Sequence, residues 1–475
     1  FLMEQIRSTI DKFNSNSQQK IIWHNLKDDL NTIDTIPQRP NEINIYMYKS
    51  GNIVEQTKQK ELGYEEIDNN GNWYVLLDEA HKGSGITEEQ KRQKFFSIIS
   101  RNGYLFNFSA TLTQPEDIRT TVFNFNLPEF LKKGYGKNLY LAQQQALAFR
   151  NDFSANDKRK IVLQSLIYLV LVKKIKEEIK NKTNIENYHN PLLVTFVNTV
   201  QTDDSDLEIF FQYLRQISSG KFTANDLKDA KKDIIKELED NPEFVFGSDP
   251  VTNEPAKILF NSNIKKIING IKKQDIFQNV FNSPTKGSWE WSTIHGIDDE
   301  LVFQHKGANE PFAVIHIGSS GIDKWKEKLA DWKLPFGGEI QDTKSYFEQA
   351  SEDKNSVNIL MGSQKFHEGW DTNRPNVMIF INIGGEDAKK YVIQAIGRGV
   401  RIRPITNLES GRKRMIYLHR DQNSDAQQII KNGVDWSEIN YIETLFILGT
   451  KRKNLQSILD FQKLTKEEQV EIKLE

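Results

Sequence analysis

The chain has 475 residues and a mass of 55.1 kDa, a length that predicts two or three domains rather than one core. Hydrophobic residues make up 37% and charged residues 27%, which excludes an intrinsically disordered chain, and the absence of cysteine excludes disulfides and thiolate metal sites. The 63 Lys and Arg nearly balance the 65 Asp and Glu, for a net charge of −2, which excludes a polybasic coat but allows a local basic groove.

Short apolar runs recur along the chain, and each ends in polar or small residues. In chain order they span 73–77, 104–108, 192–197, 312–317, 357–361, 377–381 and 415–418. Runs of this kind predict strands buried on both faces, as in parallel sheets. Helical patterns lie between several of them, at 158–182, 206–217 and 324–331. This alternation predicts an α/β fold whose sites lie beyond the carboxyl ends of its strands.

The strands form two clusters, which predicts two α/β units. We expect the first unit at 1–125, a connection at 126–157, the second unit at 158–425 and a helical tail at 426–475. The interval 218–310 lacks strong strand signals, so we expect a helical insertion with loops there. Trp289 and Trp291 lie in it, and they either stack on nucleic-acid bases or pack inside the protein.

Polar residues follow the first two predicted strands. Asp78 and Glu79 follow the first, where one carboxylate can hold Mg²⁺ while the other orients a water for phosphoryl transfer. Ser109 and Thr111 follow the second, where their hydroxyls can hydrogen-bond the acidic site. Acidic pairs and Ser/Thr turns are also common at such positions in α/β proteins without a catalytic role.

Two further groups lie late in the chain. The sequence Gln394-Ala-Ile-Gly-Arg-Gly-Val-Arg401 places two arginines on one helix face, where guanidinium groups suit phosphate oxygens. Its two glycines argue against a solvent-exposed helix face without a function. Glycine destabilises a helix, so it is expected there mainly where the backbone must approach a neighbour closely. The segment Phe366-His-Glu-Gly-Trp-Asp371 is either a ligand-contacting loop or a loop with one buried tryptophan.

The order of these four groups resembles motifs II, III, V and VI of superfamily-two helicases. The Glu-Gly-Trp-Asp form at 368–371, followed by Arg374-Pro-Asn-Val377, is most similar to the restriction subunit of type III restriction enzymes and its DEAD/DEAH-box relatives. Residues 126–135 resemble the segment that leaves the first helicase lobe, and 194–198 lie where motif IV is expected. The resemblance covers 70–135 and 190–420.

The resemblance implies an α/β fold of two RecA-like lobes with parallel sheets, the core of a P-loop NTPase helicase. The first lobe would be truncated at its N-terminus, and the second would carry the helical insertion at 218–310. ATP and Mg²⁺ are the implied cofactors.

The resemblance also implies a role for each group. The catalytic set would be Asp78 and Glu79, which bind Mg²⁺ and the hydrolytic water, with Gln394, Arg398 and Arg401 from the second lobe, the arginines as finger candidates. The residues that couple the nucleotide site to DNA would be His81, Ser109 and Thr111. Contacts to nucleotide and nucleic-acid backbone would come from Gly369, Asp371 and Gly397.

The family's phosphate-binding loop, ending Gly-Lys-Thr or Gly-Lys-Ser, is absent from this sequence. Gly136-Lys137-Asn138 lacks the hydroxyl and follows the acidic motif, which is the wrong order. Because the first residue is Phe1 rather than Met, we expect that the chain starts inside the first lobe and hydrolyses ATP poorly by itself. Glu471-Ile-Lys473 has a minimal nuclease spacing without a preceding Pro-Asp, so we expect the nuclease domain outside this chain.

We therefore expect the ATP-dependent DNA helicase or translocase core of a type III restriction endonuclease. Its expected partners are double-stranded DNA and a DNA methyltransferase (modification) subunit. No apolar run approaches the roughly 20 residues that span a bilayer, so we expect no membrane partner and a cytoplasmic location. Two alternatives stay open, a stand-alone superfamily-two helicase or repair translocase, and a non-hydrolysing DNA-binding module with the helicase fold.

Overall fold

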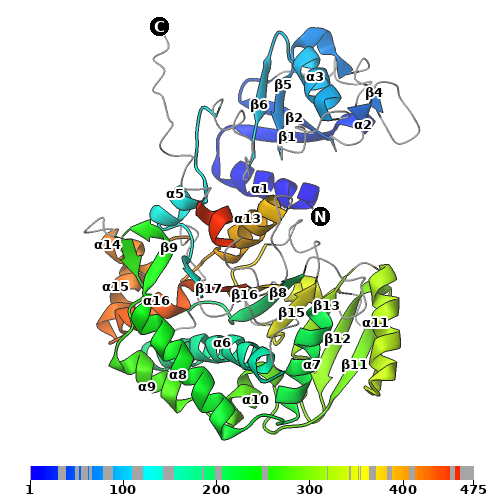
Figure 1. The fold of residues 1–475 in the computed structure, drawn as a ribbon. Helices are drawn as coiled ribbons and strands as arrows, with labels where there is room; N and C mark the ends of the chain where they lie inside the picture. The colour runs from blue at the N-terminus through cyan, green and yellow to red at the C-terminus, as the bar shows by residue number, and fades with distance from the viewer. Residues whose placement is uncertain are drawn as a thin grey trace. The chain divides into compact units, whose positions relative to one another are not determined.

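The structure is a computed structural model with two compact units, residues 1–120 and 121–475 (Figure 1). It describes residues 2–29, 39–48, 53–54, 62–63, 67–78, 89–109, 121–142, 155–184, 187–197, 206–248, 255–317, 319–341, 344–350, 352, 355–362, 371–381, 388–405, 412–449 and 455–460. Among the helices in these ranges, we find none that combines the length and the apolar character needed to cross a bilayer.

The first unit is built from short strands that pair in parallel. Its elements are α1 (Leu2–Asn16), β1 (Lys20–Asn25), α2 (Leu26–Asp29), β2 (Glu42–Met47), β3 (Ile53–Val54), β4 (Leu62–Gly63), the 3₁₀ helix η4 (Asn69–Gly71), β5 (Tyr74–Leu77), α3 (Glu89–Ile99) and β6 (Tyr104–Asn107). The pairs are β1 with β2, β3 with β4 and β5 with β6.

Strands β5 and β6 confirm the strands predicted at 73–77 and 104–108, but burial on both faces was wrong. Val75, Leu77 and Leu105 pack on a small core, whereas Tyr74 and Leu76 are 73% and 62% exposed. The side chains of a strand alternate between its two faces, so this strand pair buries one apolar face and leaves the other accessible.

The second unit is larger and alternates strands with helices. Its elements are α5 (Leu127–Lys132), β7 (Asn138–Leu141), α6 (Ala155–Thr183), β8 (Leu192–Val197), α7 (Asp206–Ser218), α8 (Ala224–Asp240), β9 (Glu243–Ser248), β10 (Pro255–Lys257), α9 (Ser262–Gly270), α10 (Lys273–Phe281), β11 (Trp289–Ile294), β12 (Ile297–His305), β13 (Ala313–His316), α11 (Ser319–Asp331), β14 (Phe336–Ile340), α12 (Tyr346–Gln349), β15 (Ile359–Gly362), β16 (Pro375–Ile381), α13 (Ala388–Gly399), α14 (Met415–Arg420), α15 (Ser424–Lys431), α16 (Trp436–Ile442) and β17 (Thr444–Gly449).

A mostly parallel sheet organises this unit. Within the described residues nine strands join it, in the order β14-β11-β12-β13-β15-β8-β16-β17-β7. Strand β12 is antiparallel to both of its neighbours, and the other pairs are parallel. The protein is therefore a mixed α/β protein with a large, mainly parallel central sheet, and the strands predicted at 192–197, 312–317, 357–361 and 377–381 are confirmed.

Both faces of this sheet are buried. In β8, Leu193 and Val197 join a core with residues of α6, α7 and α10, while Leu192, Val194 and Phe196 join a second core with α5, α12 and α13. Figure 1 shows α6 and α13 on opposite sides of the sheet. Two covered faces explain why these strands read as continuous apolar runs.

Three intervals differ from the sequence-based expectations. The interval 218–310 contains helices but also β11 and β12, whose polar residues, such as Glu290 and Gln304, interrupt an apolar pattern. The run 415–418 lies in helix α14, because so short an apolar run does not separate strand from helix. Residues 426–475 contain strand β17, which pairs with β16 and β7 in the central sheet.

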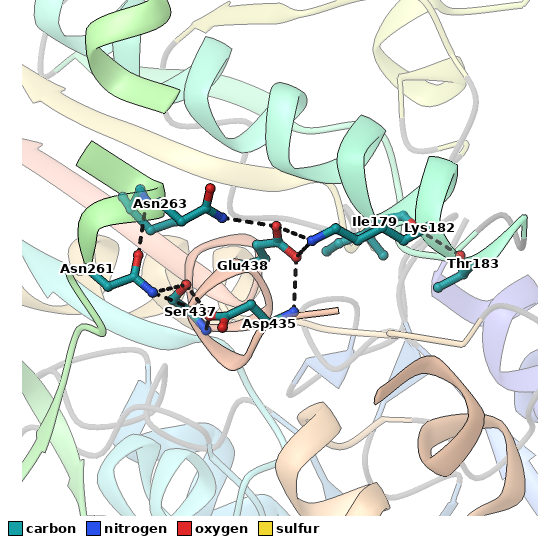
Figure 2. Close-up of polar contacts among 9 residues, drawn as sticks. Ile179, Lys182, Thr183, Asn261, Asn263, Asp435, Ser437 and Glu438 are labelled. Atoms are coloured by element: carbon teal, nitrogen blue, oxygen red, sulfur yellow. Dashed lines mark hydrogen bonds and ion pairs between the residues drawn. The ribbon is translucent and has the colours of Figure 1, made fainter. Parts of the chain in front are cut away.

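An ion pair with a buried carboxylate joins the C-terminal end of α6 to the start of α16 (Figure 2). The Lys182 ammonium donates to both carboxylate oxygens of Glu438, at 2.6 and 2.7 Å, and Asn263 of α9 donates to the same carboxylate at 3.2 Å. Glu438 also closes the capping box of α16 by accepting from the Asp435 amide at 3.1 Å. These contacts connect α6, α9 and α16 on one side of the sheet.

Candidate functional site

Asp78 and Ser109 lie just beyond the carboxyl ends of β5 and β6. Leu77 is the register partner of Asn107, and the Phe108 amide donates to the Leu77 carbonyl at 2.9 Å. The two polar residues therefore follow the same edge of one parallel strand pair, which is the edge where α/β sheets bind ligands. Asp78 is exposed and Ser109 is half-buried.

Four predicted residues, Glu79, His81, Thr111 and Gly369, lie outside the described residues. Of the pair expected to bind Mg²⁺, only Asp78 is described. Its exposed carboxylate is a hard oxygen ligand at the end of a strand, which fits the ligands that Mg²⁺ prefers.

One stripe of α13 carries the late group of predicted residues. Gln394, Gly397 and Arg398 are half-buried on this helix, and half-buried Arg401 follows just after its end. Their spacing of three or four residues places them on one side of the helix. Apolar residues on the other side of the helix are buried in the core that covers this face of the sheet, namely Val392, Ile393, Ala395, Ile396 and Val400. The stripe is thus the accessible side of a packed helix.

The two glycines of α13 have different surroundings. A Cβ atom on Gly399 would lie 2.2 Å from Met378 Cε and 2.9 Å from Leu445 Cδ2, so a larger residue at this helix end would force these side chains of β16 and β17 to move. Among the described residues, a Cβ atom on Gly397 would meet no atom within 4 Å beyond its chain neighbours and its own helix backbone. Close packing therefore explains Gly399, whereas Gly397 leaves open space on the accessible stripe.

Asp371 and Arg401 form an ion pair between the carboxylate and guanidinium groups. Arg412 adds a second positive charge, with its Nη2 3.9 Å from the other Asp371 oxygen. The Asp371 and Arg401 side chains are 45% and 31% exposed, so the pair adds less than about 1 kcal/mol to stability. Its importance is positional, because it joins the end of the 366–371 segment to the end of the arginine helix.

Lys137 is fully buried and ties the same two segments together. Its Nζ donates to the carbonyls of Asn373 and Pro375, both at 2.6 Å, and to that of Gly399 at 3.4 Å. Its amide donates to the Val400 carbonyl at 2.7 Å. In the sequence Lys137 belongs to a Gly-Lys-Asn segment that lacks the hydroxyl of a phosphate loop, and no local pattern indicates its bridging position.

Arg374 holds the start of β16 in place. This fully buried guanidinium donates to the carbonyls of Asn190 at 2.9 Å, Ala350 at 2.8 Å and Val357 at 2.6 Å. It therefore joins the chain before β8, after α12 and before β15. The sequence marked Arg374 as part of the resemblance, but not as the residue that connects these segments.

The surroundings of Arg374 are rich in positive charge. Burial, together with the smaller effects of the charges of Arg374 and Lys176, lowers the pKa of Lys173 to about 7. Burial and then the charge of Lys137 hold the pKa of His189 well below its usual value, against the effect of its hydrogen bond with Asn376. His189 is therefore neutral in the folded protein at neutral pH.

The two tryptophans of the 218–310 interval are packed. Trp289 and Trp291 lie on β11 and are 2% and 9% exposed. Their indole N–H groups donate to the Ser218 hydroxyl at 2.6 Å and the Leu334 carbonyl at 3.2 Å. Base stacking by these residues is therefore wrong, and packing inside the protein is confirmed.

No protein-family model matches the chain, and no curated protein matches it significantly. Among solved structures, the chain is similar to an ATP-dependent Type ISP restriction-modification enzyme, LlaBIII, bound to DNA, with 11% sequence identity and a TM-score of 0.29. The match covers 96% of this chain and 28% of the enzyme, so the chain spans less than a third of that protein. At this TM-score we infer neither fold nor function from the likeness.

Proposed function

We propose that the chain forms most of an ATP-dependent DNA helicase or translocase core with two RecA-like lobes. Residues 1–125 would belong to the first lobe and 158–425 to the second, and β7 and β17, which pair in the same central sheet, would belong to the second lobe as well. Both lobes of such a core bind ATP, so hydrolysis changes their separation and steps the protein along DNA.

One observation carries this proposal, the ion pair between Asp371 and Arg401. It joins the Glu-Gly-Trp-Asp group to the Gln-x-x-Gly-Arg-x-x-Arg group, the two late motifs of the resemblance. The position of Asp78 and Ser109 at one edge of a parallel strand pair supports the proposal for the two early motifs.

The roles proposed for the residues follow from their chemistry. Asp78 and Glu79 would hold Mg²⁺ and a water, and ATP supplies the phosphoanhydride bond that is cleaved. Arg398 and Arg401 would bind phosphate oxygens, and the open space beside Gly397 leaves room for a ligand on their stripe. The roles of Gln394, His81 and Thr111 stay those implied by the resemblance.

We further propose that this core belongs to the restriction subunit of a type III restriction enzyme. The sequence Arg374-Pro-Asn-Val377 after the Glu-Gly-Trp-Asp group supports this assignment. The proposed partners are double-stranded DNA and a DNA methyltransferase subunit.

The test uses the complete protein encoded by the reading frame that contains this chain. ATP hydrolysis is measured with and without double-stranded DNA for the natural protein and for Glu79→Gln, Arg398→Ala and the control Arg420→Ala. We expect DNA-stimulated hydrolysis that falls roughly 100-fold or more in the first two variants, because an arginine finger contributes at least that much. The control replaces an exposed arginine of α14 and should keep the activity.

Each other outcome selects among the alternatives. Absence of DNA-stimulated hydrolysis, or full activity in Glu79→Gln and Arg398→Ala, would refute the motor and favour a non-hydrolysing DNA-binding module. Normal hydrolysis without a co-purifying DNA methyltransferase would keep the motor and favour a stand-alone helicase.

A further inference from the structure

Two carboxylates and an imidazole meet in the second unit. Asp299 and Glu300 lie on β12 and His316 ends β13, and their donor atoms all lie within 4.8 Å of one another. His316 Nδ1 is 3.5 Å from a Glu300 oxygen and 4.0 Å from an Asp299 oxygen. The group takes no part in the proposed ATP site.

The group lies at the ligand-binding edge of the sheet. Glu300 pairs with His316 across the two antiparallel strands, and His316 pairs with Gly362 at the end of β15. Both β13 and β15 end here, so the group lies at the carboxyl edge of these parallel strands. Open α/β sheets bind their ligands beyond this edge.

The charges of the group favour a cation. Glu300 is 1% exposed and His316 is 8% exposed, so the Glu300 carboxylate lies away from water beside the carboxylate of Asp299. The hydroxyl of Ser345 and the amide of Phe347, at 3.3 Å, donate to Glu300, but neither carries a positive charge. Asp299 is partly exposed, so a cation can reach both carboxylates from that side, and its charge would offset the cost of keeping two carboxylates close together.

The neighbours of the group fix its geometry. The ring of Phe347 stacks on that of His316, with centroids 4.4 Å apart and planes at 9°, while Nδ1 faces both carboxylates. Metal-binding histidines and carboxylates are oriented by surrounding groups in the same manner. Two ligands of a tetrahedral ion at about 2.1 Å stand about 3.4 Å apart, close to the separation between His316 and Glu300.

We propose that Asp299, Glu300 and His316 bind a divalent first-row transition metal ion, such as Mn²⁺ or Zn²⁺. Two oxygen donors and one imidazole, without a thiolate, suit these ions, whereas Mg²⁺ and Ca²⁺ prefer oxygen ligands alone. The ion joins β12 to β13 and, through the hydrogen bonds of Glu300 to Ser345 and Phe347, fixes the start of α12.

The experiment measures metal binding by the complete protein after removal of metal with EDTA. An Asp78→Asn background removes the Mg²⁺ ligand proposed in the first unit, so failure of the two proposals can be told apart. Zn²⁺ and Mn²⁺ are each titrated calorimetrically into this protein, and into versions that also carry Asp299→Asn or His316→Gln. The matched control is Asp298→Asn, which removes the same charge from an exposed neighbouring position of β12.

We expect one of these ions to bind in the background protein and in the Asp298→Asn control, and to raise the thermal midpoint of both. Binding should weaken at least about 100-fold in Asp299→Asn and His316→Gln. Asp299 is half-exposed, so its variant should fold.

Two results would overturn the proposal. One is equal binding in all four proteins, and the other is absence of binding of both ions to the background protein. The electron paramagnetic resonance spectrum of bound Mn²⁺ gives a readout that needs no variant, because a histidine ligand adds nitrogen coupling and a spectrum without it contradicts the site.

Discussion

The carboxylate of Asp371 and the guanidinium of Arg401 meet although 30 residues separate them in the sequence. Asp371 lies just before β16 and Arg401 just after α13, so the contact joins the start of the strand to the end of the helix. Buried Lys137 donates hydrogen bonds to backbone carbonyls close to both residues, those of Asn373, Pro375 and Gly399, and so fixes the backbone on both sides of the ion pair. We therefore expect the ion pair to position Arg401, and the effects of its removal on stability and on ATP hydrolysis can be measured separately.

Removal of either partner of this pair should affect activity far more than stability. We expect Asp371→Asn and Arg401→Gln each to change the free energy of unfolding by less than about 1 kcal/mol, since both groups are partly exposed. DNA-stimulated ATP hydrolysis should fall at least about 10-fold in each, and the double variant should lose little more. The exposed pair Lys413–Asp421 supplies the control, because Asp421→Asn should leave hydrolysis unchanged. Additive losses in the double variant would show that the two residues act separately.

Lys137→Met should destabilise the second unit strongly. The methionine keeps most of the side-chain volume but leaves the carbonyls of Asn373, Pro375 and Gly399 without this donor. Unsatisfied buried groups cost about 1–3 kcal/mol each, partly relieved by relaxation, so we expect a loss of about 2–4 kcal/mol in urea unfolding. Lys133→Met, on an exposed neighbour of α5, is the matched control and should change stability by less than about 0.5 kcal/mol. Equal unfolding midpoints for the two variants would contradict the bridging role.

Stability should fall as the pH rises from about 4.5 to 7 because of Glu443. Burial raises the pKa of this carboxyl from 4.5 to about 7, against the hydrogen bonds that it accepts from the Met415 amide and the Tyr188 hydroxyl. The folded state therefore keeps a proton that the unfolded state releases, and this stabilisation is fully present below pH 4.5 and lost as the pH rises through about 7. The difference amounts to about 3 kcal/mol.

Glu443→Gln should remove this part of the pH dependence, because the amide oxygen can accept both hydrogen bonds without titrating. Urea unfolding at several pH values compares it with Glu239→Gln, a replacement at an exposed acid of α8. If the free energy of unfolding of Glu443→Gln changed with pH between 4.5 and 7 as it does in the natural protein, Glu443 would not be the origin of the pH dependence.

The sequence predicted the strands that are buried on both faces, because burial imposes an uninterrupted apolar run. Strand β8 is such a case, since Leu192–Val197 is wholly buried. Strand β12 was not predicted because Asp298, Asp299 and Glu300 follow its first residue, and two of these three belong to the proposed metal site. A strand that carries ligands loses the apolar pattern by which strands are recognised.

The contacts of the candidate site lay beyond the reach of sequence reasoning for a different reason. Arg401 was selected by its helix and its motif, but its partner Asp371 is set by how α13 packs on the sheet. The bridging role of Lys137 depends on β7 pairing with β17, a long-range contact that no local pattern encodes. Local periodicity predicts elements, whereas these contacts arise from the order of strands in the sheet.

The two glycines of α13 should respond oppositely to replacement by alanine. In Gly399→Ala the new methyl group would meet Met378 and Leu445, so overpacking should cost about 1–3 kcal/mol. In Gly397→Ala the methyl group enters open space within a helix, so the higher helix propensity of alanine should stabilise the protein by about 0.5–1 kcal/mol. Urea unfolding of both variants measures these effects.

The same pair of variants tests whether ATP approaches the accessible stripe of α13. If a phosphate lies against Gly397, the added methyl group should raise the KM for ATP several-fold in the complete protein, even though the fold is more stable. A purely structural glycine would give the gain in stability with an unchanged KM. That outcome would remove the stripe from the proposed site, because Arg398, Arg401 and Gly397 share one side of the helix and we expect a phosphate held by both arginines to lie beside Gly397.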